Sequence, residues 1–153
     1  MKNIVVSAIA AAVLVSLVGT ASAQALKPEE MIKIRKSGYS FMAWNMGKIK
    51  ANVDGEFNKD QVIASANAVA AVANSGLGAL FGPGTDKEVG GEKTRVKPEF
   101  FQQQDKVREV AMNFNKEANE LAKVAATGDK AAIQAQFGKT GATCKACHDS
   151  FRN

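Results

Sequence analysis

The residues of this 153-residue chain that are best suited to chemistry lie together near its C-terminus. Cys144 and Cys147 are its two cysteines, and His148 is its only histidine. If this segment is helical, the two thiols lie about one turn apart on one face, with the imidazole beside them. The pattern C-x-x-C-H is the attachment signature of c-type haem, in which the thiols form thioether bonds and the histidine binds the iron. The sequence therefore predicts one covalent haem c per chain, held by Cys144 and Cys147 with His148 as axial ligand.

Three other kinds of site use cysteine in similar patterns. A thioredoxin-like C-x-x-C pair belongs in a βαβ context, which the sequence does not show. A structural zinc site needs four ligands, and two cysteines and one histidine supply only three. A plain disulfide would account for both cysteines of an exported protein but not for the adjacent histidine. Haem attachment uses all three residues and is the interpretation we adopt.

The second axial position of the iron depends on residues upstream, because only five residues follow His148. The chain has no second histidine. The remaining candidates beyond the N-terminal segment are the methionines Met31, Met42, Met46 and Met112. The iron is therefore either bound by a methionine or open on that side, although methionines at helical spacing are most often core residues.

One stripe of the first helical stretch points to the surroundings of the haem. Ile32, Arg35, Tyr39 and Met42 step by three or four residues and share one helical face. A charge on an inward face needs a partner, so Arg35 either pairs with a haem propionate or extends to solvent. Tyr39 either lines the open face of the haem or is a core tyrosine with its hydroxyl at the rim.

Four helical stretches must position these residues. The first begins at Pro28, a residue favoured in the first helical turn. The second begins at Asn58, with Gln61 three residues later, as in a capping box. We expect helices at about 28–52, 58–81, 98–127 and 130–151, with a long connection over 82–97. This pattern predicts an all-α fold, an antiparallel four-helix bundle with its haem near the C-terminus.

The N-terminal segment and the composition indicate an exported globular protein. Residues 1–23 combine a positive start, an apolar run and a small-residue cleavage site ending at Ala23, which predicts a secretory signal peptide. An uncleaved anchor is the alternative. Cleavage leaves one domain, 24–153, which in a bacterium lies in the periplasm without a membrane segment. The net charge of +5 is spread along the chain without a basic block, which disfavours nucleic-acid binding.

The segment after the signal resembles the cytochrome c′ family, the high-spin class II c-type cytochromes, and is most similar to purple-bacterial forms with a distal tyrosine. The resemblance lies in Pro28-Glu29-Glu30, RKSGYSFMAWNMGKIK (35–50), NSGLGALFGPGTDK (74–87), TRVKPEFF (94–101) and CKACHDSFR (144–152). C-x-x-C-H alone indicates only c-type haem, and its place at the end of four helices makes the class specific. The resemblance implies a homodimer formed through the first two helices.

The resemblance also implies roles around the haem. The iron is expected to be five-coordinate, with His148 proximal and Tyr39 covering the open face. Arg35 matches a propionate-contacting arginine. Lys36 occupies the next haem-lining position, where glutamine is common, so this chain departs from the pattern there.

Further positions complete the expected haem pocket. Thr94 and Arg95 match a loop that passes the haem edge, and Arg152 matches a basic residue near the proximal face. With the helical stripe, the pocket is expected to contain Arg35, Lys36, Tyr39, Met42, Thr94, Arg95 and Arg152.

The function implied by the resemblance is binding of nitric oxide and carbon monoxide, with oxygen largely excluded. A crowded apolar pocket gives a bound dioxygen few hydrogen bonds, in agreement with that selectivity. Electron transfer with an unknown redox partner is also expected, and catalytic turnover is not. The alternative is a low-spin haem ligated by Met42 or Met46 and acting only in electron transfer. We further expect ligand entry to displace Tyr39 and so to weaken the dimer.

Overall fold

The computed structural model describes residues 26–153, and the predicted signal peptide at 1–23 lies outside them. The chain forms α1 (Pro28–Asp54), α2 (Lys59–Ala73), the 3₁₀ helix η1 (Leu77–Leu80), α3 (Glu99–Gln102), α4 (Gln104–Thr127) and α5 (Lys130–Phe151). Over these residues, β-type pairing is limited to two isolated bridges, which confirms the all-α class. None of the described helices is both long and apolar enough to cross a membrane.

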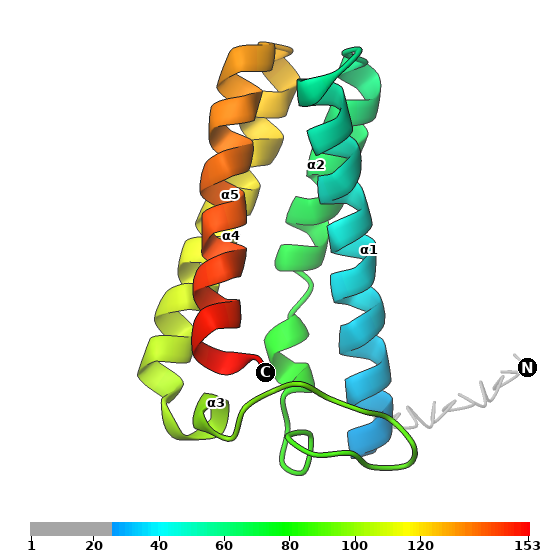
Figure 1. Cartoon of the computed structure of the whole chain (residues 1–153), viewed down its shortest axis with the longest axis vertical. Coiled ribbons are helices and arrows are strands. Elements are labelled where there is room, and N and C mark those ends of the chain that lie inside the picture. Colours follow the sequence, from blue (N-terminus) through cyan, green and yellow to red (C-terminus); the bar gives the residue numbers. More distant parts are fainter. Residues whose placement is uncertain (1–25) are drawn as a thin grey trace, which may run out of the picture.

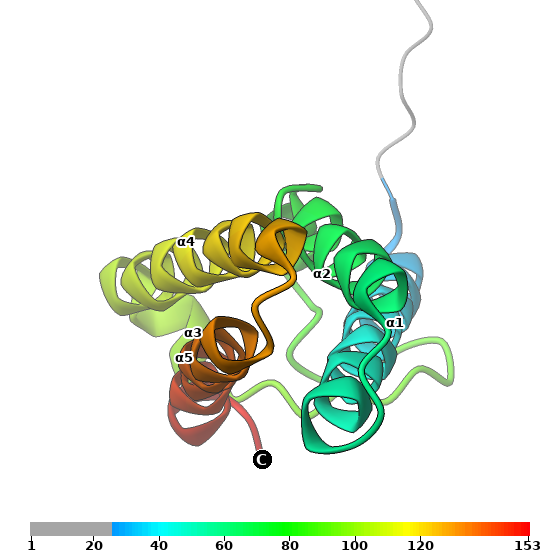
Figure 2. The same cartoon turned by 90° about the horizontal axis from the view of Figure 1, so that it is seen from above.

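The four long helices stand side by side, and each runs antiparallel to its neighbours (Figure 1). Seen from above, they follow the order α1, α2, α4, α5 around the bundle (Figure 2). This is the predicted antiparallel four-helix bundle. The connection over 81–98 crosses the lower end of the bundle in Figure 1, near the start of α1 and the end of α5.

Local signals explain where the helices begin. Pro28 is the first residue of α1, and the side chain of Asp129 caps α5 by accepting the N–H groups of Ala131 and Ala132 at 3.0 Å. Asn58 caps α2 by accepting the N–H of Gln61 at 2.9 Å. Since the Gln61 side chain instead accepts from Asn52 on α1 (2.6 Å), only half of the expected capping box forms.

The second helix is shorter than expected. It ends at Ala73, and the side chain of Asn74 turns to Asn119 on α4, donating at 2.9 Å. Gly76 then adopts a left-handed conformation (φ 81°), which a right-handed helix cannot continue through. The chain resumes as η1, which brings Phe81 to the lower end of the bundle.

The third helix is also interrupted. The expected helix over 98–127 breaks at Gln103 (φ −112°, ψ 54°) into α3 and α4. The short α3 turns Phe100 inward, where its ring stacks on Phe81 with centroids 4.3 Å apart and meets Phe151 edge-on at 5.6 Å. This aromatic packing closes the lower end of the bundle, and contacts so distant in sequence explain why the local pattern did not reveal the break.

The hydrophobic core fills the upper and middle parts of the bundle. Its buried members are Ile49, Val53, Val62, Ala66, Leu121, Ala125 and Ile133, followed by Met42, Val69 and Ala118. The alanines of α2 and α4 let neighbouring helices approach closely. The C-terminal half of α5 contributes no buried residue to either cluster, so this core ends above the cysteines.

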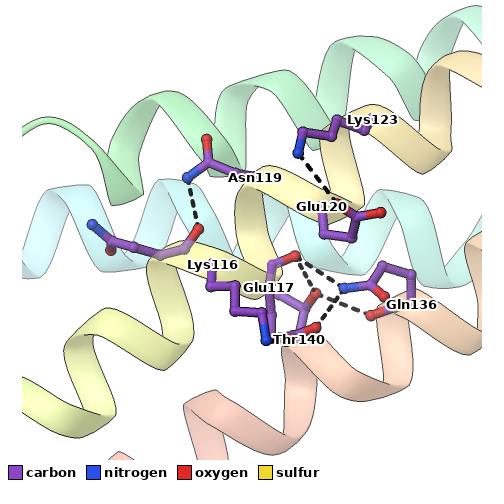
Figure 3. A network of polar contacts seen from close by, with 8 residues as sticks. Lys116, Glu117, Asn119, Glu120, Lys123, Gln136 and Thr140 are labelled. Atoms are coloured by element: carbon purple, nitrogen blue, oxygen red, sulfur yellow. Dashed lines mark hydrogen bonds and ion pairs between the residues drawn. The ribbon is translucent and has the colours of Figure 1, made fainter.

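A polar network joins α4 to α5 (Figure 3). Gln136 donates to the carboxylate of Glu117 at 2.7 Å, and the Thr140 hydroxyl donates to the Glu117 main-chain oxygen at 3.1 Å. Thr140 is fully buried. These bonds join the middle of α5 to α4.

Candidate functional site

The two cysteines lie on the inward face of α5. The buried residues that mark this face are Ile133, Gln136, Thr140 and Phe151. Cys144 and Cys147 continue it between Thr140 and Phe151, but both are only half-buried and both are free thiols. Burial raises the pKa of each thiol, so both stay protonated near neutral pH.

His148 lies beside the cysteine pair with its imidazole exposed. The guanidinium of Arg152, one turn further on, has its Nη1 3.4 Å from Nδ1 and 3.3 Å from Nε2 of this ring. On the outward side of the same turn, Lys145 pairs with Asp149 at 2.5 Å. The basic residue expected near the histidine is therefore in contact with it.

Tyr39 faces the cysteines from α1. Its ring meets Phe81 edge-on, with centroids 6.4 Å apart, and the residue is 43% exposed. The pKa of its hydroxyl is raised to about 12, first by burial around the hydroxyl and then by the thiol of Cys147, while Arg35 opposes the rise. These influences indicate that the hydroxyl is close to Cys147 and Arg35, while the residue as a whole keeps 43% of its surface exposed.

Arg35 is buried at 3% exposure and does not extend to solvent. Its Nη1 donates to the Leu80 carbonyl (3.1 Å) and the Thr85 hydroxyl (2.8 Å). Its Nη2 donates to the Thr85 carbonyl (2.6 Å) and the Thr94 hydroxyl (2.7 Å). The guanidinium also lies 4.5 Å from the centroid of Phe81. Burial lowers the pKa of this guanidinium, and Tyr39 partly offsets the change.

The neighbouring Lys36 is directed to the connection as well. Its ammonium pairs with Glu92 at 2.9 Å in an exposed position, and this hydrogen bond lowers the pKa of Glu92. Thr94 takes part in the Arg35 cluster. Arg95 is exposed, and its carbonyl accepts the N–H of Asn153 at 2.9 Å. Thr94 and Arg95 thus pass between α1 and the end of α5.

Met42 belongs to the hydrophobic core. It is 5% exposed and packs with Val69 and Ala118. Met46, one turn further along α1, packs against both core clusters. Both methionines therefore have the core role that is usual for this residue at helical spacing.

Sequence analysis did not identify two residues of this candidate site. Phe81 contacts both Tyr39 and Arg35, and Thr85 is completely buried within the long connection. The turn signals around Gly82-Pro83-Gly84 mark this segment as functional but do not single out either side chain. Their importance depends on contacts with Arg35, about 50 positions earlier in the chain.

The donor set of this region fits haem c. Two thiols on one helical face can each form a thioether bond, and the adjacent imidazole provides a nitrogen ligand. On α1, Tyr39 faces the thiols. The bonds to Leu80, Thr85 and Thr94 engage both terminal nitrogens of Arg35, so within residues 26–153 its Nε–H remains for a carboxylate.

A helical bundle whose last helix places the two cysteines of a C-x-x-C-H motif on its inward face is a c-type cytochrome by class. The family model described as Cytochrome C′ matches residues 30–152. The chain therefore belongs to the cytochrome c′ family, which carries covalently bound haem c.

Individual relatives agree with this assignment. A cytochrome c′ of Allochromatium vinosum is 55% identical, covering 99% of each chain. A solved cytochrome c′ described as having an unusual ligand-controlled dimer dissociation is 59% identical, with a TM-score of 0.83 over 84% of this chain and 98% of the other. A variant of the Alcaligenes xylosoxidans protein with bound carbon monoxide is 30% identical, with a TM-score of 0.72 over 83% and 97% of the two chains. Another variant of that protein holds nitric oxide.

Proposed function

We propose that this protein is a gas-binding cytochrome whose iron has one protein ligand. Cys144 and Cys147 hold the haem, and His148 binds the iron. The observation that carries the proposal is that α1 presents Tyr39 toward the cysteines. Met42 meanwhile packs in the core at 5% exposure. We propose that Tyr39 covers the open side of the iron and that His148 is its protein ligand.

In this proposal the surrounding residues have separate roles. When bound, haem supplies an iron that takes a diatomic ligand such as nitric oxide or carbon monoxide. The rings of Tyr39 and Phe81 cover the ligand side and limit the access of water there. Arg152 contacts the imidazole of His148 and holds its ring. Arg35 offers its Nε–H to a propionate.

A homodimer through α1 and α2 fits the outward surface of α1. Ile34, Phe41 and Trp44 are 44%, 48% and 59% exposed, and Phe41 and Trp44 pack against each other with centroids 5.7 Å apart. Large apolar side chains grouped on a surface are typical of an interface. A second copy of this chain is the partner we propose, and the dimer dissociation described for the 59% identical relative supports coupling between ligand and dimer.

Location and chemistry follow the same reasoning. We propose that residues 1–23 are removed after Ala23 and that 24–153 acts in the periplasm, where c-type haem is attached. The site offers gas binding and electron exchange without a residue set for catalytic turnover. Electron transfer through a low-spin, methionine-ligated haem remains the competing function, and the core positions of Met42 and Met46 argue against it.

The visible spectrum of the reduced holoprotein, before and after carbon monoxide, tests the proposal. We expect a broad high-spin Soret band that shifts when the gas is added. Met42→Leu and Met46→Leu should leave both spectra unchanged. Sharp low-spin bands that ignore carbon monoxide, and that become high-spin in either variant, would instead establish a methionine ligand.

A further inference from the structure

We infer that Thr85 is a positioning residue that fixes Arg35 and so holds the connection over 81–97 as a strap from α1 to the end of α5. By fixing the strap, Thr85 controls how readily a diatomic ligand passes Tyr39. This inference rests on the proposed gas binding. The strap itself is defined by contacts within the chain.

The first anchor of the strap is on α1. Thr85 is fully buried although it lies in a loop. Its hydroxyl accepts from Nη1 of Arg35 (2.8 Å) and donates to the Gly82 carbonyl (2.9 Å), while its own carbonyl accepts from Nη2 (2.6 Å). One residue thus engages both terminal nitrogens of a buried guanidinium, a geometry that a planar arginine fork favours.

The second anchor is at the end of α5. Lys97 donates its N–H to the Phe151 carbonyl, and Asn153 donates its N–H to the Arg95 carbonyl, both at 2.9 Å. Between these bonds, Val96 forms an antiparallel bridge with residue 152. The strap is therefore attached to the same helix end that carries the C-x-x-C-H motif.

Between its anchors the strap is held weakly. Within the described residues, the Lys36–Glu92 salt bridge is the side-chain contact that joins residues 86–93 to α1 outside the Arg35 cluster. Its partners are 52% and 28% exposed. Such exposed pairs contribute little. The attachment to α1 therefore depends mainly on Arg35 and its acceptors.

The α1 anchor leads directly to the ligand side of the site. The Arg35 guanidinium lies over Phe81 at 4.5 Å, and Phe81 meets the Tyr39 ring edge-on at 6.4 Å. The guanidinium that Thr85 fixes therefore acts together with Phe100, whose ring stacks on Phe81 at 4.3 Å, to hold the ring that supports Tyr39. Without the Thr85 hydroxyl, Nη1 of Arg35 keeps only the Leu80 carbonyl of its two acceptors, and the Gly82 carbonyl loses its donor. Phe81 and Tyr39 then gain freedom to move.

The test compares Thr85→Val with Thr140→Val in the holoprotein. Both replace a fully buried threonine hydroxyl by a methyl group of similar size, but Thr140 bonds to α4 and α5 outside the strap. Trypsin cleavage after Lys87 and Lys93 reports on the strap, and the association rate of carbon monoxide reports on ligand access. We expect Thr85→Val to accelerate both by about fivefold, the factor for one net hydrogen bond, and Thr140→Val to change neither.

Further variants keep the test decisive. Thr85→Ser retains the hydroxyl and should restore both rates to the wild-type values. If Thr85→Val fails to hold haem, Thr94→Val removes one acceptor of the same guanidinium and should shift both rates in the same direction. The inference is overturned if Thr85→Val matches Thr140→Val in carbon monoxide association, whether or not cleavage accelerates. If the wild-type protein itself takes up no carbon monoxide, the proposed function fails, and cleavage alone then decides whether the strap exists.

Discussion

Replacement of Arg35 by methionine tests whether its buried guanidinium organises the lower end of the bundle. Methionine has a similar unbranched stem and keeps the helix propensity, so the change removes mainly the charge and the N–H groups. In the native chain those groups bond to Leu80, to Thr85 twice and to Thr94. The substitution is expected to destabilise the protein and release the connection.

The size of the effect follows from what each acceptor retains. The Thr85 hydroxyl still donates to Gly82, and the Thr94 hydroxyl still accepts the N–H of Val96. The buried Thr85 carbonyl loses its short bond to Nη2, which costs about 1–3 kcal/mol. The other lost bonds add about 1 kcal/mol each, and relief from burying a charge offsets part of the total. We expect a net loss of about 3 kcal/mol in the free energy of unfolding.

Urea unfolding of the holoprotein, followed by far-UV circular dichroism, measures this loss. Lys36→Met is the matched control, because it removes the adjacent charge and its exposed pair with Glu92. Exposed pairs of this kind contribute about 0–1 kcal/mol. If Arg35→Met costs no more than Lys36→Met, the Arg35 cluster does not hold the connection, and the reasoning is wrong.

Three further predictions concern other parts of the molecule. Tyr39 is the only tyrosine, so tyrosinate absorbance measures the pKa of this residue alone. With free thiols we expect a pKa of about 12. Once thioether bonds remove the thiols, the pKa should fall but stay above its ordinary value, because burial is the largest cause of the rise. Since folding favours the neutral phenol, its contribution to stability is complete below pH 10 and is lost as the pH rises through 12. An ordinary midpoint in both forms would contradict the inward placement of the hydroxyl. Trp44→Ala should raise the dimer dissociation constant about 30-fold in sedimentation, the size typical of an interface hot spot, whereas Met112→Ala, 65% exposed on α4, should not. Ser65→Ala should raise the free energy of unfolding in urea by about 1 kcal/mol, because the buried Ser65 hydroxyl has no partner within residues 26–153 and alanine is the better helix former. A loss of stability would reveal an unseen partner.

Local signals were sufficient for the long helices. Pro28 and Asn58 mark helix starts where the sequence analysis expected them, and α4 ends at Thr127, the expected end of the third helix. The three- and four-residue spacing of α1 also identified its inward face, since Ile32, Arg35 and Met42 are all buried there. Capping and periodicity act within one or two turns, so one sequence reveals them.

Contacts between distant segments were not predictable in this way. The expected partner of Arg35 was a propionate or solvent, whereas in the described chain it bonds to Thr85 and Thr94, 50 and 59 positions away. The breaks after Ala73 and at Gln103 likewise serve packing between segments far apart in the sequence. Neither secondary-structure propensity nor hydrophobic periodicity predicts such partners, because each of these residues is ordinary among its sequence neighbours.

The arrangement of α1 links these observations. Its upper half is fixed by the hydrophobic core through Ile49 and Val53, whereas its lower half is held by Ile32, by the packing of Gly38 against Leu77 and by the polar cluster of Arg35. Tyr39 lies in that lower half, and Phe41, two positions later, points to the opposite face of the helix. A ligand that displaces Tyr39 would therefore act on the half of α1 that lies outside the core around Ile49 and Val53, and any shift would reach the outward surface directly. In the proposed function, gas binds on the Tyr39 side and the dimer forms through the Phe41 side. Coupling between them would then need no long pathway, because Tyr39 and Phe41 lie on two faces of one helical turn.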